Sequence, residues 1–102
     1  MSVRTVTQEN MQAEVMNSRQ TVLLDFWAPW CGPCRILSPV VDQIADERPD
    51  LKVVKVNIDQ APELAQEFGI MSIPTLVVVK DGREVRRAVG VQPKAAILEM
   101  IK

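Results

Sequence analysis

The sequence predicts an α/β domain in which a mixed five-stranded sheet carries helices on both faces. Strand-like and helix-like periodicities alternate along the chain in the order βαβαβαββα. Residues 21–27 (TVLLDFW) form a nearly continuous apolar run, which is typical of a strand buried on both faces. Asp81-Gly82 is a two-residue hairpin turn between two strand-like segments. Two crossovers and one hairpin therefore predict both parallel and antiparallel neighbours in one sheet.

Size and charge restrict the possible functions. With 102 residues, the chain fits a single domain that spans residues 1–102. It has 12 basic and 13 acidic side chains, and no basic cluster of the kind that binds nucleic acid. No apolar run approaches the roughly 20 residues that span a bilayer, and the N-terminus lacks a signal-like apolar stretch. We therefore expect a cytoplasmic, monomeric protein that binds neither membranes nor nucleic acid.

Two elements are predicted before the apolar run. Residues 2–6 read as a short strand. Thr7 is suited to cap a helix over residues 8–17, in which Met11 and Val15 share a face at i, i+4.

The longest helix follows the apolar run. It begins at Cys31 or Gly32 and extends to about residue 48, where Pro49 ends it. Pro39 has no N–H to offer the preceding turn, so we expect a kink there. The predicted buried stripe of this helix consists of Leu37, Val40, Val41 and Ile44.

A third strand and a short helix come next. Residues 51–58 (LKVVKVNI) read as the strand. Pro62 opens the helix, in which Leu64 and Phe68 pair at i, i+4, and Gly69 suits the position just after its end.

A hairpin and a last helix complete the chain. Residues 75–80 and 83–90 are the two hairpin strands, and Pro93 opens the helix. Its predicted apolar face consists of Ile97, Met100 and Ile101.

A pair of cysteines opens the longest helix, within the segment Trp30-Cys31-Gly32-Pro33-Cys34. Their spacing places both sulfurs on one side of the first turn, close enough to bond. At the N-cap, Cys31 meets the positive end of the helix dipole. Because Pro33 has no N–H, the amide of Cys34 is the natural donor to a Cys31 thiolate. We therefore predict that Cys31 is the nucleophile and Cys34 the resolving thiol.

Two other interpretations of the cysteine pair stay open: half of a zinc site, or an inert pair. A zinc site needs four ligands, and this chain has no histidine and no further cysteine, so a second chain would have to complete it. The absence of histidine also excludes Ser-His-Asp and Cys-His catalysis. We expect no bound metal and no cofactor. No G-x-G-x-x-G fingerprint for a nucleotide is present.

Several other residues are candidates for the same site. Asp25 lies in the apolar run, either as a strand-end carboxylate that reaches water or as a buried carboxyl with a raised pKa. Lys55 lies in mid-strand, where a solvated edge lysine is the ordinary interpretation. Pro74 precedes a strand, and a trans bond is the ordinary expectation there. Trp27 is expected in the core, and Trp30 as a partly exposed lid over the nucleophile.

Together these residues resemble the thioredoxin family over essentially the whole chain. The matching landmarks are DFWAPWCGPC (25–34), KVNID (55–59), Ile73-Pro74-Thr75, the hairpin turn and Gly90, in the same order and spacing. The departures are modest: there is no tyrosine, Arg35 stands where many thioredoxins have lysine, and Met11, Phe68 and Val79 stand where relatives often have larger or hydroxylated aromatic residues.

The resemblance implies the thioredoxin fold and a role for each candidate. Asp25 would move protons for Cys34, and Lys55 would lie near Asp25 and modulate its charge. Pro74 would be cis and would pack beside the cysteines, so that backbone groups of Ile73 face an incoming peptide, as in strand addition. The implied substrate contacts are Trp30, Gly32, Pro33, Ile73, Pro74 and Gly90. Two interpretations stay open for Met71, Val89 and Val91: an extension of this apolar contact surface, or ordinary core or strand packing.

The implied activity is general protein-disulfide reduction, with re-reduction by an NADPH-dependent flavoprotein, thioredoxin reductase. Implied substrates include ribonucleotide reductase, peroxiredoxin and methionine sulfoxide reductase. A disulfide oxidase or isomerase is one alternative, although those relatives place a histidine between the cysteines where this chain has Gly32-Pro33. The other alternative is a non-catalytic binding module whose thiols are incidental.

Overall fold

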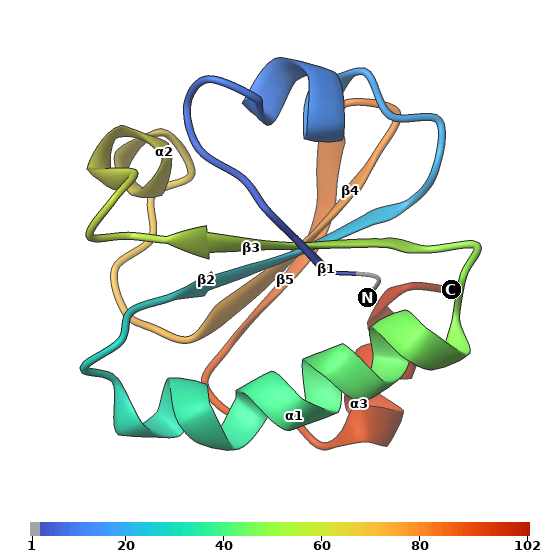
Figure 1. Ribbon diagram of the computed structural model, residues 1–102. Coiled ribbons are helices and arrows are strands. Elements are labelled where there is room, and N and C mark those ends of the chain that lie inside the picture. Colours follow the sequence, from blue (N-terminus) through green and yellow to red (C-terminus); the bar gives the residue numbers. More distant parts are fainter. Residues whose placement is uncertain (1–2) are drawn as a thin grey trace.

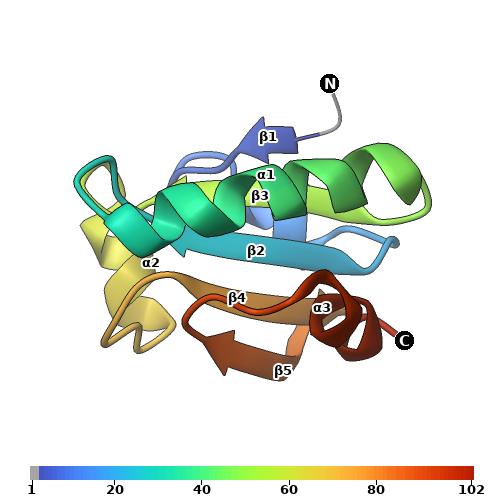
Figure 2. The ribbon, with the colours of Figure 1, turned by 90° about the horizontal axis from the view of Figure 1, so that it is seen from below.

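The computed structural model describes residues 3–102. The elements in chain order are β1 (Val3–Thr5), η1 (Gln12–Met16), β2 (Val22–Trp27), α1 (Gly32–Glu47), β3 (Lys52–Asn57), α2 (Pro62–Glu67), β4 (Thr75–Lys80), β5 (Arg83–Val89) and α3 (Lys94–Met100). Within the described range, five strands form one sheet in the order β1-β3-β2-β4-β5 (Figure 2). β3 runs parallel to β1 and β2, whereas β4 runs antiparallel to β2 and β5. The predicted mixed sheet is confirmed; residue 2 of the predicted first strand lies outside the described residues.

Helices cover both faces of the sheet (Figure 1), with η1 and α2 on one side and α1 and α3 on the other. The central strand β2 supplies both cores, because successive side chains of a strand point to opposite faces. Leu24 and Phe26 pack on the η1–α2 side, whereas Leu23 packs on the α1–α3 side. Asp25 follows the same alternation as Leu23, so this carboxyl points toward α1.

The first helical segment differs from its prediction. A helix was expected from residue 8 with Thr7 as its cap, but η1 is a short π-helical segment that begins at Gln12. The Thr7 N–H instead donates to Asn10 Oδ1 at 2.7 Å, and the Asn10 amide donates to a backbone carbonyl of β1, so Asn10 organises a turn before the helix. The predicted buried pair, Met11 and Val15, is confirmed.

α1 has the predicted start and end. Leu37, Val41 and Ile44 are fully buried, whereas Val40 is only partly buried at the edge of the stripe. The helix continues through Pro39 without interruption. The expected kink at that proline stays a prediction.

α3 packs beside α1. Ile97 and Ile101 are buried as expected, and Met100 is partly buried. Lys94 at the start of α3 pairs with Glu47 at the end of α1, with 2.6 Å between Nζ and Oε1. Among residues 3–102, no helix combines the length and apolar character that crossing a bilayer requires.

The remaining turns follow their predicted chemistry. α2 begins at Pro62, and Gly69 just beyond it has φ of +63°. Asp81 and Gly82 have φ of +51° and +76°, and a type I′ hairpin turn requires positive φ at both central positions. These backbone angles confirm the hairpin.

β5 forms an outer edge of the sheet. Most of its side chains are exposed, among them Arg83, Arg86 and Arg87. Its register with β4 shifts between Val78 and Val79, as at a β-bulge. This edge is therefore irregular and positively charged.

Candidate active site

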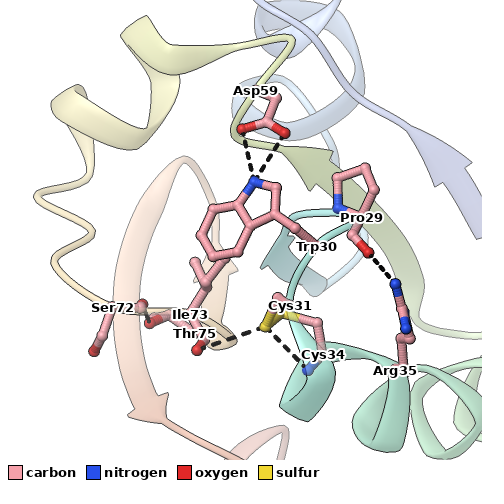
Figure 3. Close-up of a disulfide and its surroundings, with 9 residues drawn as sticks. All are labelled: Pro29, Trp30, Cys31, Cys34, Arg35, Asp59, Ser72, Ile73 and Thr75. Carbon is pink, nitrogen blue, oxygen red and sulfur yellow. Dashed lines mark hydrogen bonds between the residues drawn. A yellow bond between two sulfur atoms is a disulfide. The ribbon is translucent and has the colours of Figure 1, made fainter.

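Cys31 and Cys34 form a disulfide at the start of α1 (Figure 3). Cys31 is the N-cap residue in an extended conformation, and Cys34 lies one turn inside the helix, with their Cα atoms 5.3 Å apart. The Cys34 N–H donates to Cys31 Sγ at 3.2 Å, which is the donor expected from the missing N–H of Pro33. A thiolate at this sulfur would be stabilised by the same N–H and by the helix dipole.

The Ile73-Pro74 segment lies beside the disulfide. Its peptide bond is cis, as the resemblance implied. The carbonyl oxygen of Ile73 is 3.9 Å from Cys31 Sγ. A disulfide sulfur has no proton to donate, so this is a contact in the oxidised state that gives a reduced thiol an acceptor nearby. The Gly90 N–H donates to the Pro74 carbonyl at 2.8 Å, which fastens the segment to the end of β5.

An apolar surface surrounds the disulfide, although both cysteines are themselves almost fully buried. Met71 is 97% exposed and Trp30 is 65% exposed. A shallow hollow of about 330 Å³ is lined by Trp30, Ile58, Ile70, Met71, Ser72 and Ile73. Val89 and Val91, also exposed, were predicted for the same surface. Gly32 and Pro33 are exposed, and Gly90 is half-buried.

Trp30 is held by a residue that the sequence prediction did not single out. Its indole Nε1 donates to both carboxylate oxygens of Asp59, at 3.3 and 3.1 Å (Figure 3). Asp59 follows β3, and its own N–H donates to Asn57 Oδ1. Trp30 is thus oriented by a turn at the end of β3. Trp27, expected in the core, is partly buried against the cysteines, and its buried Nε1 has no hydrogen-bond partner among residues 3–102.

Asp25 is a buried carboxyl, which confirms the second interpretation of its sequence position. The residue is 2% exposed, and its Oδ1 has no hydrogen-bond partner among residues 3–102. Burial raises the pKa of Asp25 to about 6; Lys55 opposes this shift and Asp42 adds to it. A carboxyl with this pKa can take up and release a proton close to neutral pH.

Lys55 is the register partner of Asp25 on the neighbouring strand. Its ammonium turns toward α1, however, where Nζ lies 2.9 Å from Asp42 Oδ1 and donates to Ser38 Oγ at 2.5 Å. Lys55 is therefore close to Asp25, as the resemblance implied, but its direct partners lie on the helix.

A small cavity joins Asp25 to the inner cysteine. It has a volume of about 120 Å³, enough for a few water molecules, and is lined by Asp25, Trp27, Cys34, Arg35, Ser38 and Lys55. Both the carboxyl and Cys34 border this cavity. A larger hollow of about 550 Å³ lies on the η1–α2 side and shares no residue with the site.

Arg35 follows Cys34 and points away from the sulfurs. Its guanidinium donates to the Pro29 carbonyl at 2.8 Å (Figure 3), which ties the loop before the cysteines to α1. The predicted site residues therefore form two connected parts: an outer surface around Cys31 and an inner polar group around Cys34.

Ser38, Asp42 and Asp59 were missed by the sequence prediction. One signal for the first two was available, because Cys34, Ser38 and Asp42 are spaced at i, i+4 and i+8 on one helix. For Asp59, the signal was only a carboxylate immediately after the third strand.

Comparisons with known proteins agree with this geometry. A family model described as Thioredoxin matches residues 2–102. The chain is 52% identical over 98 residues to a thioredoxin from Pyropia yezoensis, which covers 95% of this chain and 92% of that protein. It is 53% identical over 93 residues to thioredoxin 1 from Synechococcus elongatus, with 90% and 87% covered. It is 49% identical over 98 residues to a protein named thioredoxin M-type, chloroplastic, from Chlamydomonas reinhardtii, with 95% and 70% covered.

Proposed function

Because this chain belongs to the thioredoxin family of thiol–disulfide oxidoreductases, we propose that it is a general protein-disulfide reductase. One observation carries the proposal. Cys31 Sγ accepts the Cys34 N–H at the start of α1 while lying against the Ile73 carbonyl, where an extended peptide can approach. The first contact stabilises a nucleophilic thiolate, and the second supports backbone recognition of a partner.

The reaction consists of two thiol–disulfide exchanges. The Cys31 thiolate attacks one sulfur of the substrate disulfide, the substrate S–S bond breaks, and the departing substrate thiolate takes up a proton. Cys34, deprotonated, then attacks Cys31 Sγ and displaces the second substrate sulfur as a thiolate, which also takes up a proton. The substrate gains two electrons and two protons, and the Cys31–Cys34 disulfide is formed.

Asp25 takes the proton of Cys34 in the second exchange. Its burial keeps its proton affinity higher than that of an exposed carboxyl, and the small cavity allows water to connect the two groups. Lys55, on the neighbouring strand, adjusts the charge of Asp25. Both residues therefore act behind the disulfide, on the side away from the docked partner.

Substrate recognition relies mainly on backbone and apolar contacts. Ile73 and Pro74 form one wall beside Cys31, Trp30 forms another, and Gly32, Pro33 and Gly90 complete the surface. Such contacts depend little on the side chains of the partner, which suits a reductant of many different proteins.

The oxidised protein is re-reduced by an NADPH-dependent flavoprotein, thioredoxin reductase. Ribonucleotide reductase, peroxiredoxin and methionine sulfoxide reductase are the proposed substrates. The protein acts as a monomer in the cytoplasm. Size-exclusion chromatography of the reduced and oxidised forms tests whether the protein is a monomer. Cell fractionation tests whether it is cytoplasmic.

The reduction potential of the Cys31–Cys34 couple tests the proposed direction of electron flow. Thioredoxins have potentials of about −270 mV, and protein disulfide isomerase about −180 mV. The gap of about 90 mV corresponds to about 4 kcal/mol for two electrons, so equilibration with a dithiol buffer separates the two cases clearly. A value near −180 mV would favour an oxidase or isomerase, and failure to form the intramolecular disulfide would favour a non-catalytic module.

The order of the two cysteines is tested by trapping. Cys34→Ser should accumulate a mixed disulfide between Cys31 and a protein substrate, because the resolving attack is lost. The matched variant Cys31→Ser should form much less of this adduct, because Cys34 lies one turn inside α1 and borders the inner cavity with Asp25, whereas Cys31 lies against the Ile73 backbone. Equal trapping by both variants would contradict the assignment.

A further inference from the structure

A polar stripe of α1 faces the sheet behind the disulfide. Cys34, Ser38 and Asp42 follow one another at four-residue spacing, so they lie along one side of the helix. Opposite them, Asp25 and Lys55 are register partners on β2 and β3. The helix and the two strands thus bring one inner thiol, two carboxylates, one hydroxyl and one ammonium together.

Within this group, Lys55 pairs with the helix and not with its strand neighbour. Its Nζ lies 2.9 Å from Asp42 Oδ1, and it donates to Ser38 Oγ at 2.5 Å. Among residues 3–102, Asp25 makes no ion pair within 4.0 Å, and its Oδ1 is buried without a partner. The ammonium is therefore tethered next to a carboxylate that it does not contact directly.

We propose that Asp42, assisted by Ser38, is a positioning residue that holds the Lys55 ammonium on α1 and so prevents it from forming an ion pair with Asp25. The inference rests on the proposed role of Asp25 as the proton acceptor for Cys34. An ion pair with lysine would favour the charged carboxylate and make it a weaker base. The tether keeps Lys55 near enough to moderate the charge of Asp25 without neutralising it.

The other charged groups around Asp25 do not replace this tether. On α1, Arg35 lines the same cavity, but its guanidinium donates to the Pro29 carbonyl. On β4, the register partner of Asp25 is the uncharged Leu76. Asp42 also repels Asp25 directly, and this repulsion raises the pKa of Asp25 in the same direction as the tether does. The experiment must therefore separate two effects of Asp42 on the pKa of Asp25: its direct repulsion of Asp25, and its tethering of Lys55.

The measurement is the titration of the Asp25 carboxyl carbon by NMR in the oxidised protein. In that state Cys31 and Cys34 do not titrate, and the chain has no histidine that would titrate near pH 6. Asp42→Asn should lower the Asp25 midpoint by roughly 1 pH unit, because Lys55 is freed to approach it. Asp42→Glu should keep most of the wild-type midpoint. Glu47→Gln, which removes the same charge from the far end of α1, should leave it unchanged.

The Lys55→Gln background separates the two explanations. If Asp42 acts through Lys55, the shift caused by Asp42→Asn should fall below half of its original size when Lys55 is absent. A shift of full size in that background would mean that repulsion alone operates, and the proposal would be wrong. An Asp25 midpoint that does not move in Asp42→Asn would also overturn it.

The side chain of Asp42 is 49% exposed, so its substitution should not unfold the protein. Ser38→Ala is a second variant, which should lower the Asp25 midpoint by a smaller amount. The titration requires no substrate, so its result does not depend on activity. The proposed role of Asp25 fails separately if Asp25→Asn resolves mixed disulfides at the wild-type rate.

Discussion

Replacing Asp25 with asparagine should stabilise the protein at neutral pH but not at low pH. Asparagine has nearly the shape of a protonated aspartic acid, and it cannot ionise. In the folded protein the pKa of Asp25 is raised from 3.8 to about 6 because the carboxyl is buried. The native state therefore keeps a proton between these two pH values that the unfolded chain releases, so wild-type stability falls as pH rises through this window.

The size of the effect follows from the same shift. A difference of about 2 pKa units, at about 1.4 kcal/mol per unit, amounts to about 3 kcal/mol. The free energy of unfolding of Asp25→Asn should exceed that of the wild type by about this amount above pH 7. The excess should shrink as the pH falls through this window and approach zero at about pH 3, where the wild-type carboxyl is protonated in both states. Any fixed cost of the buried amide adds equally at every pH.

Urea unfolding of the oxidised proteins at a series of pH values measures this difference, provided that the slopes agree between variants. Asp50→Asn is a matched control, for which the change in the free energy of unfolding should have the opposite sign. Arg48 lowers the pKa of Asp50 through a hydrogen bond, so removing that carboxyl should cost stability near neutral pH and not at low pH. If the Asp25→Asn gain were the same at pH 4 and pH 8, or absent at both, burial of an ionised Asp25 would not be the cause.

Three further outcomes are expected. Leu37→Ala should lower the free energy of unfolding by about 2–5 kcal/mol, because this side chain is fully buried beneath α1; urea unfolding measures it, and a loss under 1 kcal/mol would contradict the packing. Gly82→Ala should lower the free energy of unfolding by about 1–2 kcal/mol in the same assay, since φ is +76° and a Cβ would lie 3.1 Å from the Met16 carbonyl oxygen. Asp81→Asn should lower it much less, because asparagine is accepted at this position of the turn. Trp30→Ala should lower kcat/KM for a protein disulfide about tenfold, a loss of about 1.4 kcal/mol, but change reduction of a small disulfide much less; equal losses would mean that Trp30 does not bind the partner.

Local signals predicted most of the fold. The hairpin followed from Asp81-Gly82, because few dipeptides accept positive φ at two successive positions. The start of α1 and the Cys34 N–H donor followed from the missing N–H of Pro33. The first helix was predicted wrongly at its start, because residues 8–10 form a turn in which the Asn10 side chain accepts from the Thr7 N–H and donates to the Thr5 carbonyl, and periodicity does not contain this turn geometry.

The site was predicted less completely, for a different reason. Asp25 stood out because a carboxyl within an apolar run must either be buried or lie at a strand end where it reaches water. The cis bond at Pro74 was expected only from family resemblance, since the residues alone favour trans. The pairing of Lys55 with Asp42 depends on the direction of a long, flexible side chain between a strand and a helix. Such contacts between distant segments are set by packing and not by local sequence.

The arginines on β5 have a consequence for how this chain behaves at high concentration. An edge strand offers unpaired backbone groups that another copy could extend into a shared sheet. Here Arg83 and Arg86 would place like charges near one another in such a pairing, although Arg87 is ion-paired with Glu84 of the same strand, and the irregular register beside Val79 disturbs its alignment. We expect this edge to resist aggregation, in contrast to the backbone beside Cys31, where we proposed that an extended partner peptide binds.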